Sequence, residues 1–124
     1  MKHLEDNLQR SCIRWFDYRY PKLRLLLHHS PNGGRRDERE AARFKAMGVR
    51  AGFPDLILLV PNGEYPFLGI ELKTAKGRQS EHQKEYEAEF GYIGAKYVVV
   101  RSSEEFVNTI ESYLKNFNYA GYKH

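Results

Sequence analysis

Two spacings of apolar residues recur along the chain, and each predicts a different kind of element. The first positions with the period of a helix are Leu4, Leu8, Cys12 (or Ser11) and Trp15. They predict a helix over residues 3–17, ended by Tyr20-Pro21. Short apolar runs without that period indicate strands, and they occupy residues 25–27, 56–60, 67–72 and 97–100. The last run is uninterrupted, which is typical of a strand covered on both faces.

Three later segments carry the start and stop signals of helices. Residues 37–47 have a helical pattern that Gly48 ends. Ser80 and Gln83 have the spacing of a capping box, which predicts a helix from Ser80 to about residue 90. Ser102 and Glu105 repeat that spacing before a final amphipathic helix that reaches residue 117.

Polar segments separate these elements, and their order predicts the fold class. Residues 30–34 carry strong turn signals, and residues 74–79 are expected to form a polar, flexible connection. A hairpin followed by a helix, a strand and a helix implies a mixed sheet flanked by helices, an α/β fold. The length of 124 residues predicts one domain, residues 1–124.

The two runs around residue 63 predict an antiparallel hairpin that brings acidic residues together. Residues 61–66 contain the Pro, Asn and Gly of a hairpin loop. Facing residues in such a hairpin have a constant index sum, so a turn centred near Gly63 places Asp55 opposite Glu71, with Cβ atoms about 5 Å apart. Side chains alternate between faces, so Glu71 and Lys73 project together while Leu72 points into the core.

Two carboxylates beside an ammonium group suit a hard divalent cation and a phosphodiester. Oxygen ligands favour Mg²⁺ or Mn²⁺, and no cluster of Cys and His has the spacing of a zinc site. Lys73 would then offset charge that develops on a phosphoryl group. The alternative is that Glu71 and Lys73 line the solvated face of an edge strand, where charges deter aggregation.

Composition is consistent with a protein that meets a polyanion inside a cell. The formal net charge is +4, and positive charge favours association with nucleic acid. A single cysteine, Cys12, excludes an intramolecular disulfide framework and is compatible with a reducing compartment. The sequence shows neither a membrane-length apolar run nor the apolar region of a signal peptide at its N-terminus. We therefore expect a cytoplasmic location.

Five motifs in this order resemble the VRR-NUC family, virus-type replication and repair nucleases of the PD-(D/E)XK superfamily. They are Pro31-Asn32-Gly33-Gly34-Arg35, Lys45-Ala46-Met47-Gly48, Gly52-Phe53-Pro54-Asp55-Leu56, Ile70-Glu71-Leu72-Lys73 and Gln79-Ser80-Glu81-His82-Gln83. The resemblance spans roughly residues 5–100 and implies the restriction-endonuclease-like PD-(D/E)XK core, a mixed sheet flanked by helices.

The resemblance also implies roles for individual residues. Asp55 and Glu71 match the metal-binding acids, the backbone carbonyl of Leu72 would join them, and Lys73 matches the catalytic lysine. Gln83 matches a glutamine that touches the attacking water or a phosphate, although the N3 position of a capping box is an equal alternative. One side chain is not expected to do both. Glu5 matches an acidic residue of the metal site, and its alternative is a favourable interaction with the helix dipole.

Further residues match or suggest contacts with DNA. The loop before the second helix matches a family loop, and its arginines would meet a phosphate at a helix start, where the dipole disfavours cations. The alternative is a simple turn capped by Asn32. The expected DNA-binding residues are Asn32, Gly33, Gly34, Arg35, Arg36, Arg50, Lys76 and Arg78. Aromatic residues such as Tyr86 and Tyr97 are suited to stacking on bases, but their spacing is more typical of a core.

The resemblance predicts a Mg²⁺- or Mn²⁺-dependent nuclease that hydrolyses phosphodiester bonds in DNA. Family members of this size resemble junction resolvases, and a homodimer supplies the two active sites that a four-way (Holliday) junction needs. Branched DNA is therefore the expected substrate. The alternatives are a flap- or duplex-specific nuclease and a non-catalytic DNA-binding module of the same fold, although such modules usually lose a carboxylate or the lysine.

Overall fold

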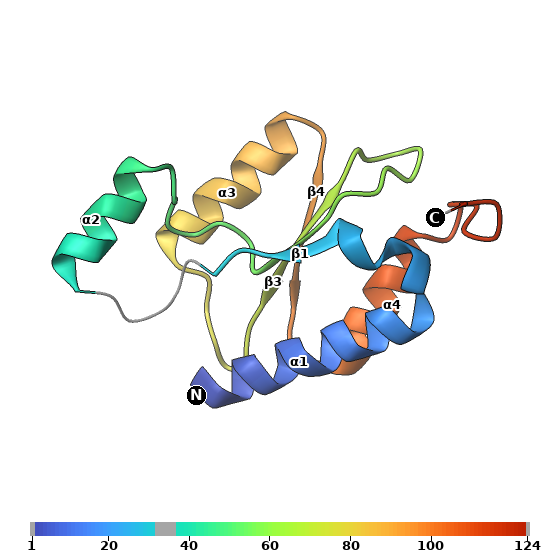
Figure 1. Ribbon diagram of the computed structural model, residues 1–124, viewed down its shortest axis with the longest axis horizontal. Helices are drawn as coiled ribbons and strands as arrows, with labels where there is room; N and C mark the ends of the chain where they lie inside the picture. The colour runs from blue at the N-terminus through green and yellow to red at the C-terminus, as the bar shows by residue number, and fades with distance from the viewer. Residues whose placement is uncertain (1, 32–36, 124) are drawn as a thin grey trace.

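Four helices, one 3-10 helix and four strands make up the described part of the chain, residues 2–31 and 37–123 of a computed structural model (Figure 1). The order is α1 (Lys2–Arg19), η1 (Pro21–Leu26), β1 (Leu27–His29), α2 (Glu38–Ala46), β2 (Leu56–Leu58), β3 (Leu68–Leu72), α3 (Glu81–Tyr92), β4 (Lys96–Val100) and α4 (Ser103–Tyr113). None of the described helices is long and apolar enough to cross a membrane. The predicted α/β fold with a mixed sheet is confirmed.

The sheet has the strand order β1-β2-β3-β4, with β1, β2 and β3 antiparallel and β4 parallel to β3. In the β2–β3 hairpin Leu56 pairs with Ile70 and Leu58 with Leu68. These pairs confirm the constant index sum predicted from the sequence. The strand β3 lies between two neighbours, so Glu71 does not line an edge strand and that alternative is wrong.

Helices cover the two faces of β3 differently, because its side chains alternate. Leu68, Ile70 and Leu72 are buried in the same core cluster as Phe16 of α1 and Phe106 of α4. The other face of β3 meets α3, where a Cβ at Gly69 would lie 2.5 Å from the Phe90 ring. Glu71 shares that second face. Helix α3 therefore packs close enough to reach it.

The structure corrects two strand predictions. Residues 25–26 belong to a 3-10 helix that begins with Pro21, Leu25 is 85% exposed, and the strand follows at Leu27–His29. Proline at the first helical turn favours this start because it has no N–H to satisfy. The strand β4 is at the sheet edge and only Val100 is buried, so the expectation of cover on both faces was wrong.

Helix α2 stands apart from the rest of the molecule (Figure 1). None of its residues is buried. It begins at Asp37, whose side chain accepts a hydrogen bond from the Glu40 backbone N–H at 2.7 Å. An N-cap and helix propensity, rather than burial in the core, therefore hold this segment helical.

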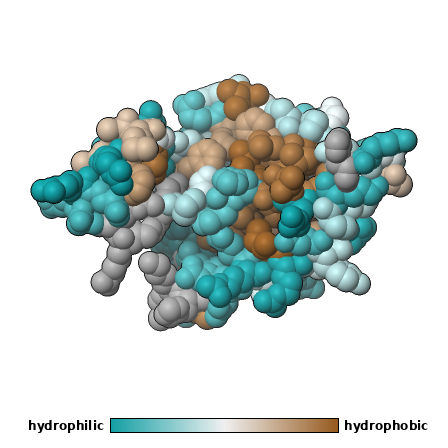
Figure 2. Space-filling model, viewed as in Figure 1, coloured by the Kyte–Doolittle hydropathy of each residue, from teal (hydrophilic) through white to brown (hydrophobic). Residues whose placement is uncertain are grey.

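Apolar side chains also gather on the surface. Figure 2 shows hydrophobic residues over the middle of the face on which β1 lies in Figure 1. Near this strand, Leu25 is 85% exposed and Leu59 is 51% exposed, and the Leu59 N–H bonds to the Leu26 carbonyl. This patch, defined by Leu25 and Leu59, adjoins an edge strand of the described sheet.

Candidate active site

Asp55 is fixed just before β2 by hydrogen bonds to the strands on either side of it. Its Oδ2 accepts a hydrogen bond of 2.7 Å from the backbone N–H of Leu72, across the hairpin. Its carbonyl oxygen lies 2.8 Å from Nδ1 of His29, on β1. The carboxylate therefore continues the β2–β3 ladder at the position that faces Glu71.

The backbone that leads to Asp55 lies against the start of α3. Gly52 has a φ of 87°, and a Cβ there would lie 2.5 Å from the backbone carbon of His82. A side chain at this position would therefore be strained and would collide with main chain. Gly52 allows the segment with Asp55 and the helix with Gln83 to approach one another.

Glu71 is a buried carboxylate with polar partners from three separate parts of the chain. Its side chain is 2% exposed. Oε2 accepts a hydrogen bond from Nε2 of Gln83 at 2.5 Å and lies 3.8 Å from Nζ of Lys73. Oε1 lies 3.5 Å from the hydroxyl of Tyr97, on β4. Both oxygens therefore have partners, as a buried carboxylate requires.

Gln83 closes the predicted capping box, and the same side chain also binds Glu71. Its Oε1 accepts a hydrogen bond from the Ser80 N–H at 2.8 Å, and the Ser80 hydroxyl accepts one from the Gln83 N–H at 3.1 Å. These two bonds complete the predicted capping box. The opposite end of the same amide binds Glu71. Capping therefore does not occupy the whole side chain, because an amide has a separate acceptor and donor end. The contact of Gln83 with the attacking water or a phosphate stays a prediction.

Burial raises the pKa of Glu71 to about 8. Loss of water around the carboxylate is the largest cause, and the nearby Asp55 carboxylate adds repulsion and a hydrogen bond that favours the protonated form. The ammonium of Lys73 acts in the opposite direction. Burial and the facing carboxylate of Asp55 therefore favour the protonated form of Glu71.

The donor set around Glu71 fits a hard divalent cation. Asp55 and Glu71 supply carboxylate oxygens, and the backbone of Leu72 lies beside Asp55. The negative charge of Glu5 also raises the pKa of Glu71, but by less than burial or Asp55 does. Among the described residues no group of three or more His, Cys, Asp or Glu is close enough to hold a metal. The geometry thus supports a two-carboxylate site and does not bring Glu5 into it.

Two residues at this site were not assigned from the sequence. Tyr97 was expected to belong to the core, yet it meets Glu71, and burial raises its pKa, so the phenol stays a donor. The register of β4 on β3 places Tyr97 beside Gly69. The parallel pairing of β3 and β4 brings Tyr97 to Glu71, and local spacing in the sequence does not predict that pairing.

Arg101 is the second unassigned residue. Its guanidinium donates to the carbonyls of Thr74 at 2.8 Å and Gly77 at 2.6 Å. It therefore holds the segment directly after Lys73, which is closed further by a hydrogen bond from the Gly77 N–H to the Thr74 carbonyl. The connection expected here to be flexible is instead a turn held by hydrogen bonds. Its exposed side chains include Lys76, and Arg78 is exposed just after it.

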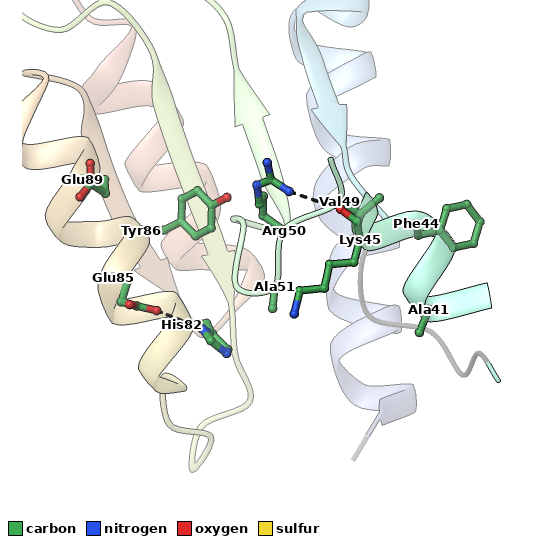
Figure 3. Close-up of a pocket in the computed structure, with 10 residues that line it drawn as sticks. All are labelled: Ala41, Phe44, Lys45, Val49, Arg50, Ala51, His82, Glu85, Tyr86 and Glu89. Carbon is green, nitrogen blue, oxygen red and sulfur yellow. Dashed lines mark hydrogen bonds and ion pairs between the residues drawn. The ribbon is translucent and has the colours of Figure 1, made fainter. Parts of the chain in front are cut away.

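The remaining expected DNA-binding residues are distributed differently. Asn32, Gly33, Gly34, Arg35 and Arg36 lie outside the described residues. Arg50 is exposed and lies beside α2, with its guanidinium 3.4 Å from the carbonyl oxygen of Lys45 (Figure 3). Of this group, the structure therefore locates Arg50, Lys76 and Arg78.

The raised pKa of Glu71 predicts how stability depends on pH. The pKa is about 8 in the folded chain against an ordinary 4.5, so the folded state binds more protons between these values. Stabilisation is complete below about pH 4.5 and is lost as the pH rises through 8. In chelator, we expect urea unfolding to give a free energy that falls by up to a few kcal/mol from pH 5 to pH 8.

The Glu71→Gln variant should remove most of this fall, because an amide does not titrate. Glu64→Gln, at an exposed glutamate in the hairpin loop, is the matched control and should keep it. A wild-type fall that persists unchanged in Glu71→Gln would contradict a neutral buried Glu71.

Comparisons with known proteins agree with this geometry. A model of the VRR-NUC domain matches residues 3–104. A solved structure described as a VRR_NUC domain protein is 34% identical, superposes with a TM-score of 0.79, and the match covers 90% of this chain and 88% of that one. A search of curated proteins gave no match. The shared fold, the extent of the match and the opposed carboxylates lead to one conclusion: the chain belongs to the VRR-NUC family, a family of nuclease-type domains.

Proposed function

We propose that the protein is a metal-dependent endonuclease that hydrolyses phosphodiester bonds in DNA. The observation that carries this proposal is the position of Asp55 opposite Glu71, with Lys73 on the same side at 3.8 Å from the Glu71 carboxylate. A non-catalytic module of this fold would not need to bury a glutamate that faces a second carboxylate and has an ammonium beside it, because such burial costs stability.

Each side chain then has a separate task. Asp55, Glu71 and the backbone carbonyl of Leu72 would hold Mg²⁺ or Mn²⁺, which when bound supplies positive charge to the phosphate and lowers the pKa of a water. Lys73, only 13% exposed, places its ammonium where negative charge develops on the phosphoryl oxygens. Gln83 and Tyr97 hold the two oxygens of Glu71 in a fixed orientation.

Branched DNA, with a four-way junction as the first choice, is the substrate that we propose. A junction has two strands to cut, and a two-fold homodimer would present two active sites to them. The apolar patch of Leu25 and Leu59 supports this assembly, because exposed apolar side chains beside an edge strand favour cover by another chain. Glu5 and the loop of residues 32–36 remain proposed as substrate- or metal-facing positions on the resemblance alone.

Cleavage of labelled DNA tests the proposed activity. Purified protein should cut a four-way junction with Mg²⁺ or Mn²⁺ and not with EDTA, and flap, splayed and linear duplex DNA should be cut less. Asp55→Asn and Lys73→Ala should each lower the rate by at least about 100-fold, the scale for loss of one preorganised electrostatic group. DNA binding should be retained.

Arg24→Ala, at an exposed residue of η1, is a matched control for loss of charge and should leave the rate unchanged. If every substrate stays intact with both metals, the protein is a binding module. A preference for flaps or plain duplex would replace the junction as substrate and leave the chemistry in place.

The contact between Tyr97 and Glu71 predicts a positioning effect. Tyr97→Phe removes one hydroxyl and keeps the ring, so we expect kcat to fall about threefold to tenfold, within the range for loss of one ordinary hydrogen bond. KM should stay unchanged. Tyr92→Phe, at an exposed tyrosine on α3, is the control. An unchanged kcat in Tyr97→Phe would show that the hydroxyl does not orient Glu71.

The patch of Leu25 and Leu59 predicts the oligomeric state. Light scattering should give the mass of a dimer for the wild type and of a monomer for Leu25→Glu, because the new charge would be buried in the interface. Tyr18→Glu, at an 86% exposed residue of α1, should stay dimeric. A monomeric wild type at assay concentrations would argue against a junction resolvase.

A further inference from the structure

A cleft of about 570 Å³ lies between α2 and α3. Residues 49–51 form its floor (Figure 3). A second cavity of about 480 Å³ continues from it, since the two share Phe44, Val49, Arg50 and Tyr86 as lining residues. Each volume is in the range of sites that bind small ligands, ~300–1,000 Å³. The two cavities together have room for more than one small ligand.

The two sides of the cleft carry opposite charge. Lys45 of α2 and Arg50 of the floor are cationic, and Figure 3 shows the Lys45 side chain extending into the gap between the helices. The α3 side carries Glu85 and Glu89, with Nδ1 of His82 at 3.0 Å from Glu85. An anionic group is therefore favoured on the α2 side and disfavoured on the α3 side.

An aromatic ring projects from the acidic side. Tyr86 is half-buried, extends from α3 toward Arg50 in Figure 3, and packs edge-on against Phe53 with ring centroids 5.3 Å apart. That contact fixes the ring in one orientation. A fixed ring beside a cleft provides a surface on which a nucleobase can stack.

The cleft also adjoins the candidate active site. Tyr86 lies one helical turn after Gln83, and Phe53 lies two residues before Asp55. The second cavity reaches His28, next to the residue whose ring bonds to the Asp55 carbonyl. A ligand in the cleft would therefore be a near neighbour of a phosphodiester at the two carboxylates.

We propose that this cleft binds an unpaired nucleotide of the DNA substrate, next to the bond that is cut. The base stacks on Tyr86, where Glu85 and Glu89 can accept hydrogen bonds from its N–H groups, and the phosphate lies toward Lys45 and Arg50. Bases within a duplex are stacked on each other and cannot reach Tyr86 with a ring face. The proposal builds on the proposed nuclease activity and specifies how branched DNA is held: the nucleotide next to the cut is unpaired at the branch point and occupies the cleft.

Binding in chelator tests this proposal without cleavage. The probes are fluorescein-labelled oligodeoxythymidylate and a duplex of equal length, followed by anisotropy. We expect Tyr86→Leu to weaken binding of the single strand about tenfold, as for loss of one stacked base, and to leave duplex binding unchanged. Tyr92→Leu, at an exposed tyrosine on the same helix, should change neither.

Lys45→Glu is a second variant that does not depend on the fold of the core, because α2 has no buried residues. It should weaken binding of the single strand and lower the slope of log K against log salt by about 0.7, the value for one lost phosphate contact. Arg39→Glu makes the same charge change on an exposed residue of α2 outside the cleft lining, and its slope should stay that of the wild type.

Equal loss of single-strand and duplex binding in Tyr86→Leu, or no loss of either, would overturn the proposal. A Lys45→Glu variant that behaves like Arg39→Glu would do so as well. Tyr86-dependent binding by a protein that cuts no DNA would refute the nuclease activity and support the cleft as a binding site, so the two proposals fail separately.

Discussion

The burial of Glu71 is the constraint on which the rest of the site depends. A carboxylate that is 2% exposed in the second of two central strands must find partners within the protein. The structure supplies them from the residue that follows β3, from α3 and from β4, through Lys73, Gln83 and Tyr97. These contacts link the central hairpin to the elements that follow it. This one buried residue therefore organises the polar contacts on its face of the sheet.

Helix α3 is attached to the sheet at both of its ends, and each attachment uses a different kind of contact. At its start, Gln83 closes the capping box with Ser80 and also binds Glu71, so the same side chain caps the first turn and orients the carboxylate. Toward its end, Phe90 packs on Gly69 of β3. The opposite side of the helix is left to face α2, which has no buried residue, and the cleft between them follows from that separation.

Much of the fold could be predicted from local patterns. The helix starts at Ser80 and Ser102 follow from side chains that cap their own helices, and each accepts the expected backbone hydrogen bond. The Ser102 cap differs in one detail, because Glu105 accepts from the Arg101 N–H instead of closing the box. Leu25 was misplaced because Pro21 favours a 3-10 turn over an extended strand, and an apolar triplet alone does not distinguish them.

The sequence by itself determined which residues face each other across the β2–β3 hairpin, because pairing about a short loop has a fixed index sum and strands alternate faces. It therefore located Asp55, Glu71 and Lys73 on one side. Only the tertiary structure decided what surrounds them. The parallel pairing of β4 brings Tyr97 to Glu71, and the packing of α3 lets Gln83 cap its own helix and donate to Glu71 at once. It also decided that Arg101 ties the turn after Lys73. These contacts join residues distant in sequence, and no local period or spacing specifies them.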